Sequence, residues 1–260
     1  MTFEFDGEKY KKASSHQKEW GVKLISELKF NGDECILDLG CGDGAITAQL
    51  ADCVPNGYVI GIDASQGMIN AAKKNHKADN LKFELIDIDA IIYQSKFDII
   101  ISNATLHWVK DHKKLITNVY TALKSNGVAR FNFAAAGNCS NFFKIIKKAM
   151  EQPKYEKYFK SFIWPWYMPS IEEYKALVEK DSFSEIKVWE ENADRDFPNA
   201  DAMTRWIDQP SIVPFLECVN EEDARGFRNA VVKQMIKATS QPDGTYFETF
   251  RRINLLVKKM

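Results

Sequence analysis

The stretch "LDLGCGDGAI", residues 37–46, decides the fold, because it joins an apolar run to a glycine-rich loop and then to a helical pattern. Its three glycines lie within five positions, and Asp38 and Asp43 add negative charge on either side of the loop's start. A glycine-rich turn between a strand and a helix lets the backbone approach a ligand closely and directs free N–H groups toward it. The stretch therefore predicts a ligand-binding loop at the edge of an α/β sheet.

Short apolar runs alternate with helical segments after this loop. An amphipathic helix is expected at 17–29, Ser65 is the expected N-cap of a helix at 66–76, and Asn126-Gly127 is expected to stop a helix that ends near Lys124. Apolar strands that are each followed by a helix indicate a parallel sheet covered on both faces. The expected strands are "CILDL", "YVIGID", "LKFELID", "FDIIIS" and "VARFNFA".

The pattern changes after Gly137. Residues 153–169 hold seven aromatic residues and three prolines, which is too broken for a regular core helix. Two further strands are expected at 184–197 and 246–259, near a sheet edge. The sequence thus predicts one α/β domain over 1–260, with an N-terminal cap at 1–30 and lid insertions near 138–169 and 199–243 that cover the ligand-binding edge.

Composition excludes several classes of partner. The 260 residues include 35 basic and 36 acidic side chains, so we expect neither nucleic acid nor an anionic membrane as partner. The five cysteines are widely spaced without a C-x-x-C pair, and there are only four histidines, so no metal site is expected and the thiols suit a reducing cytoplasm. The polar, acidic start does not resemble a signal peptide, and no apolar run is long enough to span a bilayer.

The glycine loop fits two kinds of ligand by pattern alone. Gly40, Gly42 and Ala45 satisfy the relaxed dinucleotide pattern G-x-G-x-x-A, and Asp63 follows at the spacing of a ribose-binding acid. A pyrophosphate here would meet Asp38 and Asp43, and two like charges about 4 Å apart repel by about 4 kcal/mol at an effective dielectric near 20. S-adenosylmethionine carries an ammonium and a sulfonium group and no phosphate, so the charges favour it over a nicotinamide dinucleotide.

At this point the chain resembles the class I S-adenosylmethionine-dependent methyltransferases. The resemblance spans roughly 34–134 through "ILDLGCGDG", "GIDAS", "FELIDID", "FDIIISNATLHW" and "LKSNGVARFNF", and it is specific because five spaced elements agree. It implies an α/β, Rossmann-like fold with a seven-stranded, mostly parallel sheet. It also implies that S-adenosylmethionine is the methyl donor and S-adenosylhomocysteine the product.

The resemblance assigns the cofactor-binding residues. It implies that Asp38 and the loop at 40–44 hold the methionyl part, that Asp63 binds the ribose hydroxyls, and that Asp87 reads the adenine, although Asp89 is an alternative. Met68 is expected beside the adenine or in the core. The implied cofactor-binding set is Gln17, Asp38, Gly40, Cys41, Gly42, Asp63, Ala64, Met68, Asp87, Ile88, Asn103 and Ala104.

The residues after the fourth strand suggest the acceptor. "SNAT", residues 102–105, lacks the D/N-P-P-F/Y/W tetrapeptide of base amino methyltransferases. The segments "YKKASSHQKEWG", "LHWVKDH" and "WIDQPSIVPFLE" instead resemble the trans-aconitate methyltransferase group, with juvenile hormone acid and malonyl-carrier-protein methyltransferases more distant. These enzymes esterify carboxylates, which need no catalytic base because their pKa lies near 4. The segment "RDFPNAD" departs from the trans-aconitate pattern, so a simpler acid or another acceptor stays open.

The same resemblance places the acceptor residues. His107 and Trp108 are expected as the floor of the substrate pocket, where His107 either donates to a carboxylate or serves as a general base. The N-terminal segment is expected to cap the cofactor and touch the acceptor through Tyr10, Ser15, His16, Gln17 and Trp20.

Aromatic and basic side chains complete the expected site. Trp164, Trp166 and Tyr167 are expected on the lid, where they exclude water and face the sulfonium. His76 and His112 are expected to be solvated. Candidates to hold a substrate carboxylate are Arg195, Arg205, Arg251 and Arg252.

The sequence therefore predicts a cytoplasmic enzyme that methylates a small molecule, most directly at a carboxylate oxygen. The alternatives are O-, N- or C-methylation of another small metabolite, and a module that binds S-adenosylmethionine without turnover. The oligomeric state stays open.

Overall fold

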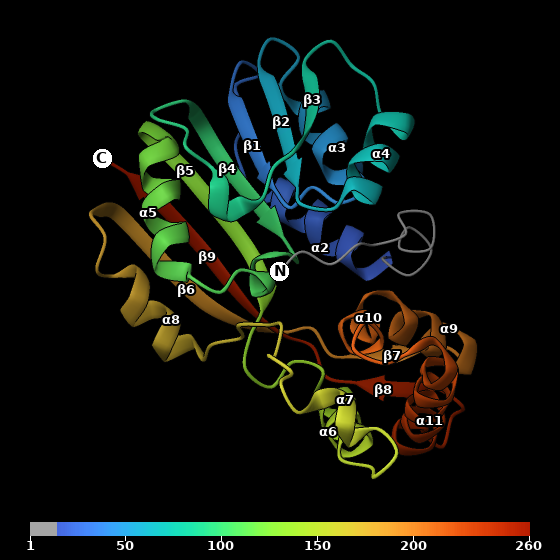
Figure 1. The fold of residues 1–260 in the computed structure, drawn as a ribbon. Helices are drawn as coiled ribbons and strands as arrows, with labels where there is room; N and C mark the ends of the chain where they lie inside the picture. Colours follow the sequence, from blue (N-terminus) through green and yellow to red (C-terminus); the bar gives the residue numbers. More distant parts are fainter. Residues whose placement is uncertain (1–14) are drawn as a thin grey trace. The chain divides into compact units, whose positions relative to one another are not determined.

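The computed structural model describes residues 15–260, apart from the side chains of residues 15, 16, 18 and 210. Within it the chain separates into two compact units, each built from segments that are distant in sequence (Figure 1). The first unit comprises the chain up to residue 136 together with 166–191 and 252–260, and the second comprises 137–165 and 192–251. The insertions predicted near 138–169 and 199–243 thus both contribute to the second unit. Its later segment, 192–251, begins before and ends after the predicted 199–243.

The first unit contains a seven-stranded sheet with the order β3-β2-β1-β4-β5-β9-β6. Strands β1 to β5 pair in parallel along this order, and β9 pairs antiparallel with β5. The predicted Rossmann-like fold with a mostly parallel sheet is confirmed. The strands are β1 (Cys35–Leu39), β2 (Tyr58–Asp63), β3 (Leu81–Leu85), β4 (Phe97–Asn103), β5 (Leu123–Ala134), β6 (Phe183–Asn192) and β9 (Arg251–Lys259).

The strand order places a topological switch between β1 and β4. From β1 the chain proceeds outward to β2 and β3, then returns to β4 and proceeds to β5 on the other side. Loops that leave the carboxyl ends of β1 and β4 therefore diverge, and ligands of open α/β sheets bind in the crevice that this divergence creates. The loop quoted above leaves β1 at this point.

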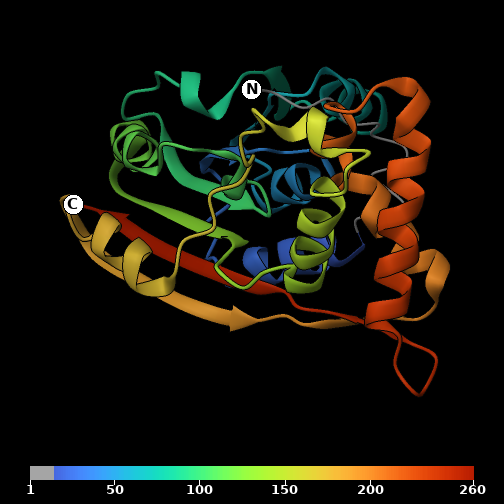
Figure 2. The same cartoon turned by 60° about the horizontal axis from the view of Figure 1, so that its bottom comes forward.

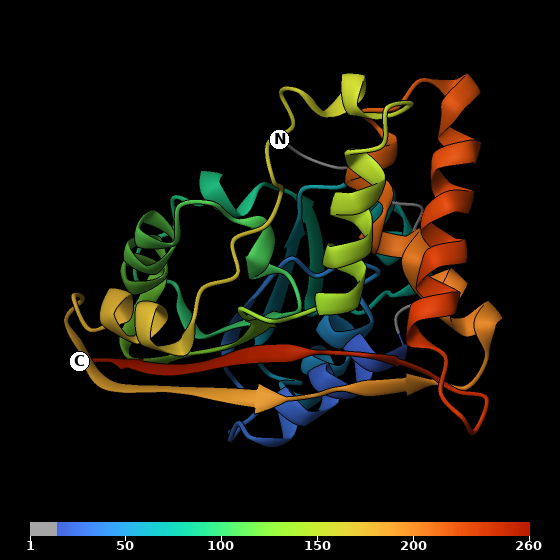
Figure 3. The same ribbon diagram turned by 90° about the horizontal axis from the view of Figure 1, so that it is seen from below.

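Helices cover both faces of the sheet because its central strands are apolar on both sides. Leu37 and Leu39 of β1 contribute to one buried cluster, and Ile36 contributes to another on the opposite face. Figure 3 shows α5 and α8 on one side of β9 and β6, and α2 on the other. The covering helices are α2 (Ser15–Ser26), α3 (Ala45–Cys53), α4 (Gln66–Asn75), α5 (His112–Ala122) and α8 (Ile171–Val178).

The structure divides each of the two late strands predicted from the sequence. Residues 184–197 give β6 and a separate β7 (Arg195–Phe197), and 246–259 give β8 (Tyr246–Glu248) and β9. In each case the first unit keeps one part, while β7 and β8 pair in a two-stranded antiparallel sheet of the second unit. Strands β9 and β6 lie side by side at the edge, as predicted (Figure 2).

Helix boundaries follow the predicted signals with small shifts. Ser65 caps α4 by accepting a hydrogen bond from the Met68 N–H, as predicted. Helix α5 ends at Ala122, and β5 starts at once with Leu123 opposite Phe97. Asn126 then takes a left-handed φ of 66° inside β5, where the register to β4 shifts, so the Asn126-Gly127 signal marks an irregularity of the strand and not the helix end.

The second unit has its own aromatic core. Phe142, Phe215 and Phe227 are fully buried, and Phe215 packs against Phe142, Phe159 and Phe162. Residues 153–169 contain only one short helix, in agreement with the expected irregular segment. The helices of this unit are α6 (Ser140–Met150), α7 (Glu156–Phe159), α9 (Ala200–Trp206), the π-helical turn η3 (Ile207–Ser211), α10 (Val213–Leu216) and α11 (Glu221–Thr239).

Candidate ligand-binding site

The glycine loop between β1 and α3 folds over the end of β2. The N–H groups of Gly40 and Cys41 donate to the carbonyl of Ile62 at 2.8 and 2.9 Å. Gly42 adopts a φ of 54°, and a Cβ placed there would meet nothing within 4 Å. The loop is therefore anchored at its start and faces open space at Gly42, as a loop that lets a ligand approach the backbone must do.

Asp38 lies at the base of this loop and is buried. Its Oδ2 accepts a 2.7 Å hydrogen bond from the Thr47 hydroxyl. Burial raises the pKa of Asp38 to about 7, and the nearby charge of Asp63 adds to the increase. A buried carboxyl of this kind gains from a cationic ligand, because an ammonium group would stabilise its charged form.

Asp63 ends β2 and joins the loop to the next turn. Its Oδ2 accepts from the Gly42 N–H at 3.0 Å, and its Oδ1 accepts from the Ser65 N–H at 2.9 Å. Ala64 follows, half-buried, and Met68 packs in the interior with 3% exposure. Asp63 is thus oriented by two backbone donors at the carboxyl end of its strand, and the alternative that Met68 is a core residue fits its burial.

Asp87 and Ile88 lie after β3, at the 3₁₀ turn η1 (Ile88–Ala90). The Asp87 side chain caps this turn by accepting from the Asp89 N–H at 2.9 Å, and it is exposed to solvent. Ile88 is buried. This arrangement holds the Asp87 carboxylate at the edge where β3 ends, and Asp89 is exposed beside it.

The end of β4 is strained and tightly packed against the glycine loop. Ala104 adopts a φ of 56°, which costs an L-residue free energy and is concentrated at functional sites. The Thr105 hydroxyl lies 3.1 Å from the carbonyl oxygen of Gly40 and 3.2 Å from that of Asn103. A Cβ at Gly40 would overlap the Thr105 side chain, so only glycine fits there. Thr105 was not predicted from the sequence.

Helix α2 closes the other side of this strand end. The Asn103 Nδ2 donates to the main-chain carbonyl of Gln17 at 2.7 Å. The Oδ1 of Asn103 and the Oε1 of Gln17 are both enclosed by protein, and neither has a hydrogen-bond partner among the described residues. Two enclosed acceptor oxygens at one strand end are the kind of atom that a ligand donor satisfies. Of the other N-terminal residues, Tyr10 and the side chains of Ser15 and His16 lie outside the described residues.

His107 and Trp108 form the 3₁₀ turn η2 (Leu106–Trp108) after β4. The carbonyl of His107 accepts from the Tyr167 N–H at 2.8 Å, and the Trp108 ring lies 5.2 Å from that of Trp166. The His107 Nδ1 is enclosed and has no hydrogen-bond partner within residues 15–260. Burial, the charge of Arg252 and the proximity of His112 lower the pKa of His107 well below 6.5, so its ring is neutral at neutral pH. Trp166 and Tyr167 thus lie beside His107 and Trp108.

His112 was expected to be solvated, and this expectation is wrong. Its ring is 2% exposed, with Nε2 at 2.9 Å from the Leu106 carbonyl and Nδ1 at 3.2 Å from the Tyr174 hydroxyl. Because the carbonyl only accepts, Nε2 carries the proton and the hydroxyl donates to Nδ1. Burial lowers the pKa of His112 to about 4. The sequence did not predict that His112 is buried and hydrogen-bonded, because it lies at a helix end and its partner Tyr174 is distant in sequence.

Trp164 belongs to the second unit, unlike Trp166 and Tyr167. Its ring packs 5.1 Å from Phe143 and 5.7 Å from Phe215, and the Lys147 ammonium lies 5.2 Å from its centre. The structure therefore places Trp164 in the aromatic core of that unit, and its substrate-binding role stays a prediction.

A buried polar layer under α2 is the largest feature missed from the sequence. It consists of Arg130, Asn132, Arg252 and Asn254, which are each at most 2% exposed. Arg130 pairs at 2.6 Å with Glu27, which directly follows α2, and the Asn254 Oδ1 accepts from Arg130 and Asn132 at 2.9 Å each. The available signal was the polar residue at every second position of "ARFNF" and "RRINL", because alternate strand residues share one face.

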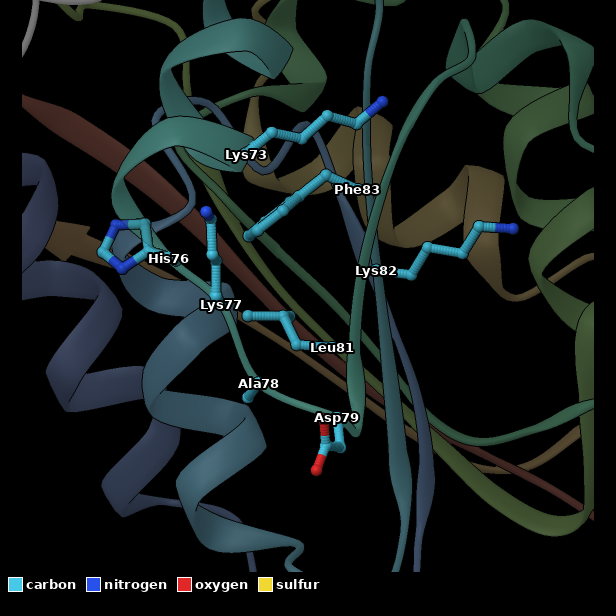
Figure 4. A pocket seen from close by; sticks show the side chains of 8 residues that line it. All are labelled: Lys73, His76, Lys77, Ala78, Asp79, Leu81, Lys82 and Phe83. Carbon is cyan, nitrogen blue, oxygen red and sulfur yellow. The ribbon is translucent and has the colours of Figure 1, made fainter.

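Another hollow, of about 470 Å³, is separate from this site (Figure 4). It lies where β3 begins, whereas the predicted adenine-binding residues lie where β3 ends. Its lining is Lys73, His76, Lys77, Ala78, Asp79, Leu81, Lys82 and Phe83. Among residues 15–260, no group of three or more His, Cys, Asp or Glu side chains is arranged to hold a metal ion. Over the same residues, every helix is too short or too polar to cross a bilayer.

The known proteins that are compared with this chain below are all methyltransferases. The chain is 33% identical over 158 residues to a malonyl-[acyl-carrier protein] O-methyltransferase of Bacillus cytotoxicus, a match covering 59% of this chain and 54% of the relative. It is 27% identical over 223 residues to a trans-aconitate 2-methyltransferase of Deinococcus radiodurans, with 84% of both chains covered. The matches to the malonyl-carrier-protein enzymes span only about half the length of those relatives.

The fold has solved counterparts. A phosphoethanolamine N-methyltransferase of Haemonchus contortus superposes with a TM-score of 0.61 at 18% identity, over 98% of this chain and 57% of that protein. This likeness agrees with the strand order described above. The methyltransferase domain family itself matches residues 31–192 of the 260, from the start of β1 to the end of β6. Because this match covers more than half of the chain, and the fold agrees with it, the chain belongs to the methyltransferase domain family.

Proposed function

We propose that the protein transfers a methyl group from S-adenosylmethionine to a carboxylate oxygen of a small molecule, in the cytoplasm. The observation that carries the proposal is the glycine loop, which faces open space at Gly42 between Asp38 and Asp63. Family membership and the carboxylate-bearing substrates in the names of the two relatives support it.

The residues at the carboxyl ends of β1, β2 and β4 fit this cofactor. Asp38 is buried and gains from a nearby cation, and Asp63 is held by two backbone donors at the end of β2, where a ribose would lie. The enclosed oxygens of Asn103 and Gln17 have no donor among residues 15–260, and an ammonium group would supply one. When bound, S-adenosylmethionine supplies an electrophilic methyl group on a positively charged sulfur.

The residues of η2 suit an acceptor that can react without first losing a proton. A carboxylate is ionised at neutral pH, so the protein only has to orient it and exclude water. The lowered pKa of His107 keeps its ring neutral, which makes it a weak base that still has one ring N–H to donate to an anion. We propose that His107 and Trp108 form the acceptor floor, with Trp166 and Tyr167 beside them. The lid role of the two insertions stays a prediction.

The test is methyl transfer from labelled S-adenosylmethionine into a metabolite extract, with the products divided by treatment with mild base. Label released as methanol supports a methyl ester, whereas base-stable label supports transfer to nitrogen, carbon or a phenol and overturns the carboxylate assignment. Matched variants are Asp63→Asn at the carboxyl end of β2 and Asp79→Asn before the amino end of the neighbouring β3. Only the former should lose labelling. Tight cofactor binding with no label above a heat-treated control would support the binding module instead.

A further inference from the structure

The four arginines that the sequence offers as carboxylate ligands differ sharply in the structure. Arg195, Arg205 and Arg251 belong to the second unit, and Arg251 forms an ion pair with Asp194 there. Arg252 alone of the four belongs to the first unit, on β9. Of the four, Arg252 is therefore the candidate carboxylate ligand that lies in the same unit as His107 and Trp108.

The Arg252 guanidinium is held in one orientation inside the buried polar layer. The side chain is 2% exposed, and its Nε and Nη2 donate to the Asn132 Oδ1 at 2.8 and 2.6 Å. Its Cζ lies 4.2 Å from the centre of the Trp20 ring. The hydrogen bonds to Asn132 and the contact with Trp20 fix the direction of the guanidinium, and an arginine side chain carries a permanent positive charge.

This charge lies close to the proposed acceptor floor. Asn132 of β5 pairs with Asn103 of β4, so the Arg252–Asn132 contact adjoins the strand end that leads into η2. Arg252 is also one of the charges that lower the pKa of His107. The neighbouring Asn103 Oδ1 and His107 Nδ1 are enclosed, and the part of the chain that the structure describes offers neither a hydrogen-bond partner. A permanent cation beside enclosed polar atoms marks a place where a ligand completes the hydrogen bonding.

Resting on the proposed methyl transfer, we infer that Arg252 is the specificity-determining residue that selects an anionic, carboxylate-bearing acceptor. Asn132 and Trp20 are the positioning residues that orient it. A carboxylate gains from the guanidinium charge and accepts from the neutral imidazole of His107, whereas an amine or a neutral hydroxyl gains little from the same cation. The inference adds an assigned residue and a reason for selectivity to the reaction proposed above.

The charge balance of the reaction predicts which kinetic constant Arg252 controls. One carboxylate oxygen forms a bond to the methyl carbon as the carbon–sulfur bond breaks, and the electron pair of that bond remains on sulfur. An anion and a sulfonium thus become a neutral ester and a neutral thioether, with no proton moved. The attraction to Arg252 is strongest before transfer and fades as it proceeds, so it stabilises the bound acid more than the transition state. Loss of the charge should therefore raise KM and leave kcat unchanged or higher.

The experiment measures acceptor binding in the full chain saturated with S-adenosylhomocysteine. The probes are trans-aconitate, malonate and straight-chain monocarboxylates from butanoate to hexadecanoate, each paired with its primary amide. We expect the wild type to bind at least one acid at least tenfold more tightly than its amide. Arg252→Gln should abolish this preference and Arg252→Lys should retain part of it. Arg228→Gln removes a guanidinium of the second unit that pairs with Asp208, so it is the matched control and should leave acid binding unchanged.

Three results would overturn the inference: no acid preferred over its amide, a preference that survives Arg252→Gln, or an Arg252→Gln variant that weakens S-adenosylhomocysteine in place of the acid. The last result would assign Arg252 to the cofactor carboxylate. If Arg252→Gln fails to fold, the acid–amide contrast in the wild type and in Arg252→Lys decides. Arg252-dependent acid binding without ester formation would refute the proposed reaction and keep the inference. Base-labile methylation of an acid that does not depend on Arg252 would refute the inference and keep the proposed reaction.

Discussion

The Asp38 carboxyl couples ligand binding to the release of a proton. Its pKa of about 7 in the ligand-free protein means that the carboxyl is largely protonated at pH 6 and charged at pH 8. A cationic ligand favours the charged form, so its binding should release a proton and strengthen as pH rises from 6 to 8. Calorimetric titration of S-adenosylhomocysteine in buffers of different ionisation enthalpy measures that proton. Asp38→Asn should weaken binding and remove the pH dependence; an unchanged profile in this variant would contradict the assignment.

The same carboxyl affects stability with the opposite sign to an ordinary salt-bridged acid. Because its pKa is raised above 3.8 in the folded state, the folded protein binds more protons than the unfolded chain between about pH 4 and 7. The contribution of Asp38 to the free energy of unfolding is therefore lost as pH rises through this window. Ligand binding restores it by supplying a cation.

Asp63 is the second residue whose substitution is informative. Asp63→Asn keeps the size of the side chain and removes its charge, which weakens the hydrogen bonds from the Gly42 and Ser65 N–H groups and those to ribose hydroxyls. Hydrogen bonds to charged groups contribute about 1.5–3 kcal/mol, so cofactor affinity should fall by about 10- to 100-fold. Equilibrium dialysis with S-adenosylmethionine measures the loss. Equal affinity in the variant and the wild type would show that the ribose is bound elsewhere.

The turn η2 is held by a hydrogen bond from His112, a residue of helix α5. His112 donates to the Leu106 carbonyl, and its pKa of about 4 lies below the value of 6.5 in an unfolded chain. The unfolded chain then binds more protons between these values, so the stability that neutral His112 contributes is complete above pH 6.5 and falls, by about 3 kcal/mol, as pH decreases toward 4. Urea denaturation at several pH values should show a shallower acid loss in His112→Gln than in the wild type, whereas the partly exposed His76→Gln is the control that should match the wild type.

The elements themselves could be predicted well from the sequence. Five strands from β1 to β5 and the helix after Ser65 follow directly from apolar runs and cap residues, because these signals are local. The division of 184–197 into β6 and β7 could not be predicted, since it depends on pairing with β9 and β8 far along the chain. The cofactor residues were proposed from local motifs and family resemblance, and their roles stay predictions. Thr105, His112 and the polar layer were missed or misplaced, because their partners are distant in sequence.

The two compact units should differ in how they respond to core mutations. Phe215 is fully buried among the aromatic side chains of the second unit, and truncation of a buried phenylalanine costs about 3–5 kcal/mol. In Phe215→Ala, hydrogen exchange measured by mass spectrometry should accelerate in α6 and α11 and change little in β1, β2 and β4. Uniform acceleration through the seven-stranded sheet would show that the units unfold as one.

The position of β9 has a consequence for synthesis on the ribosome. This strand, Arg251–Lys259, lies between β5 and β6 in the sheet, although it is translated after both of them. Nascent chains fold from the N-terminal side as they emerge, so β5 keeps an open edge while both segments of the second unit are made, and β6 waits for the second of them. Until Arg252 and Asn254 arrive, Asn132 lacks these two partners in the polar layer, and Arg130 lacks Asn254. The period between translation of residue 134 and residue 259 is therefore when this protein most needs protection by chaperones.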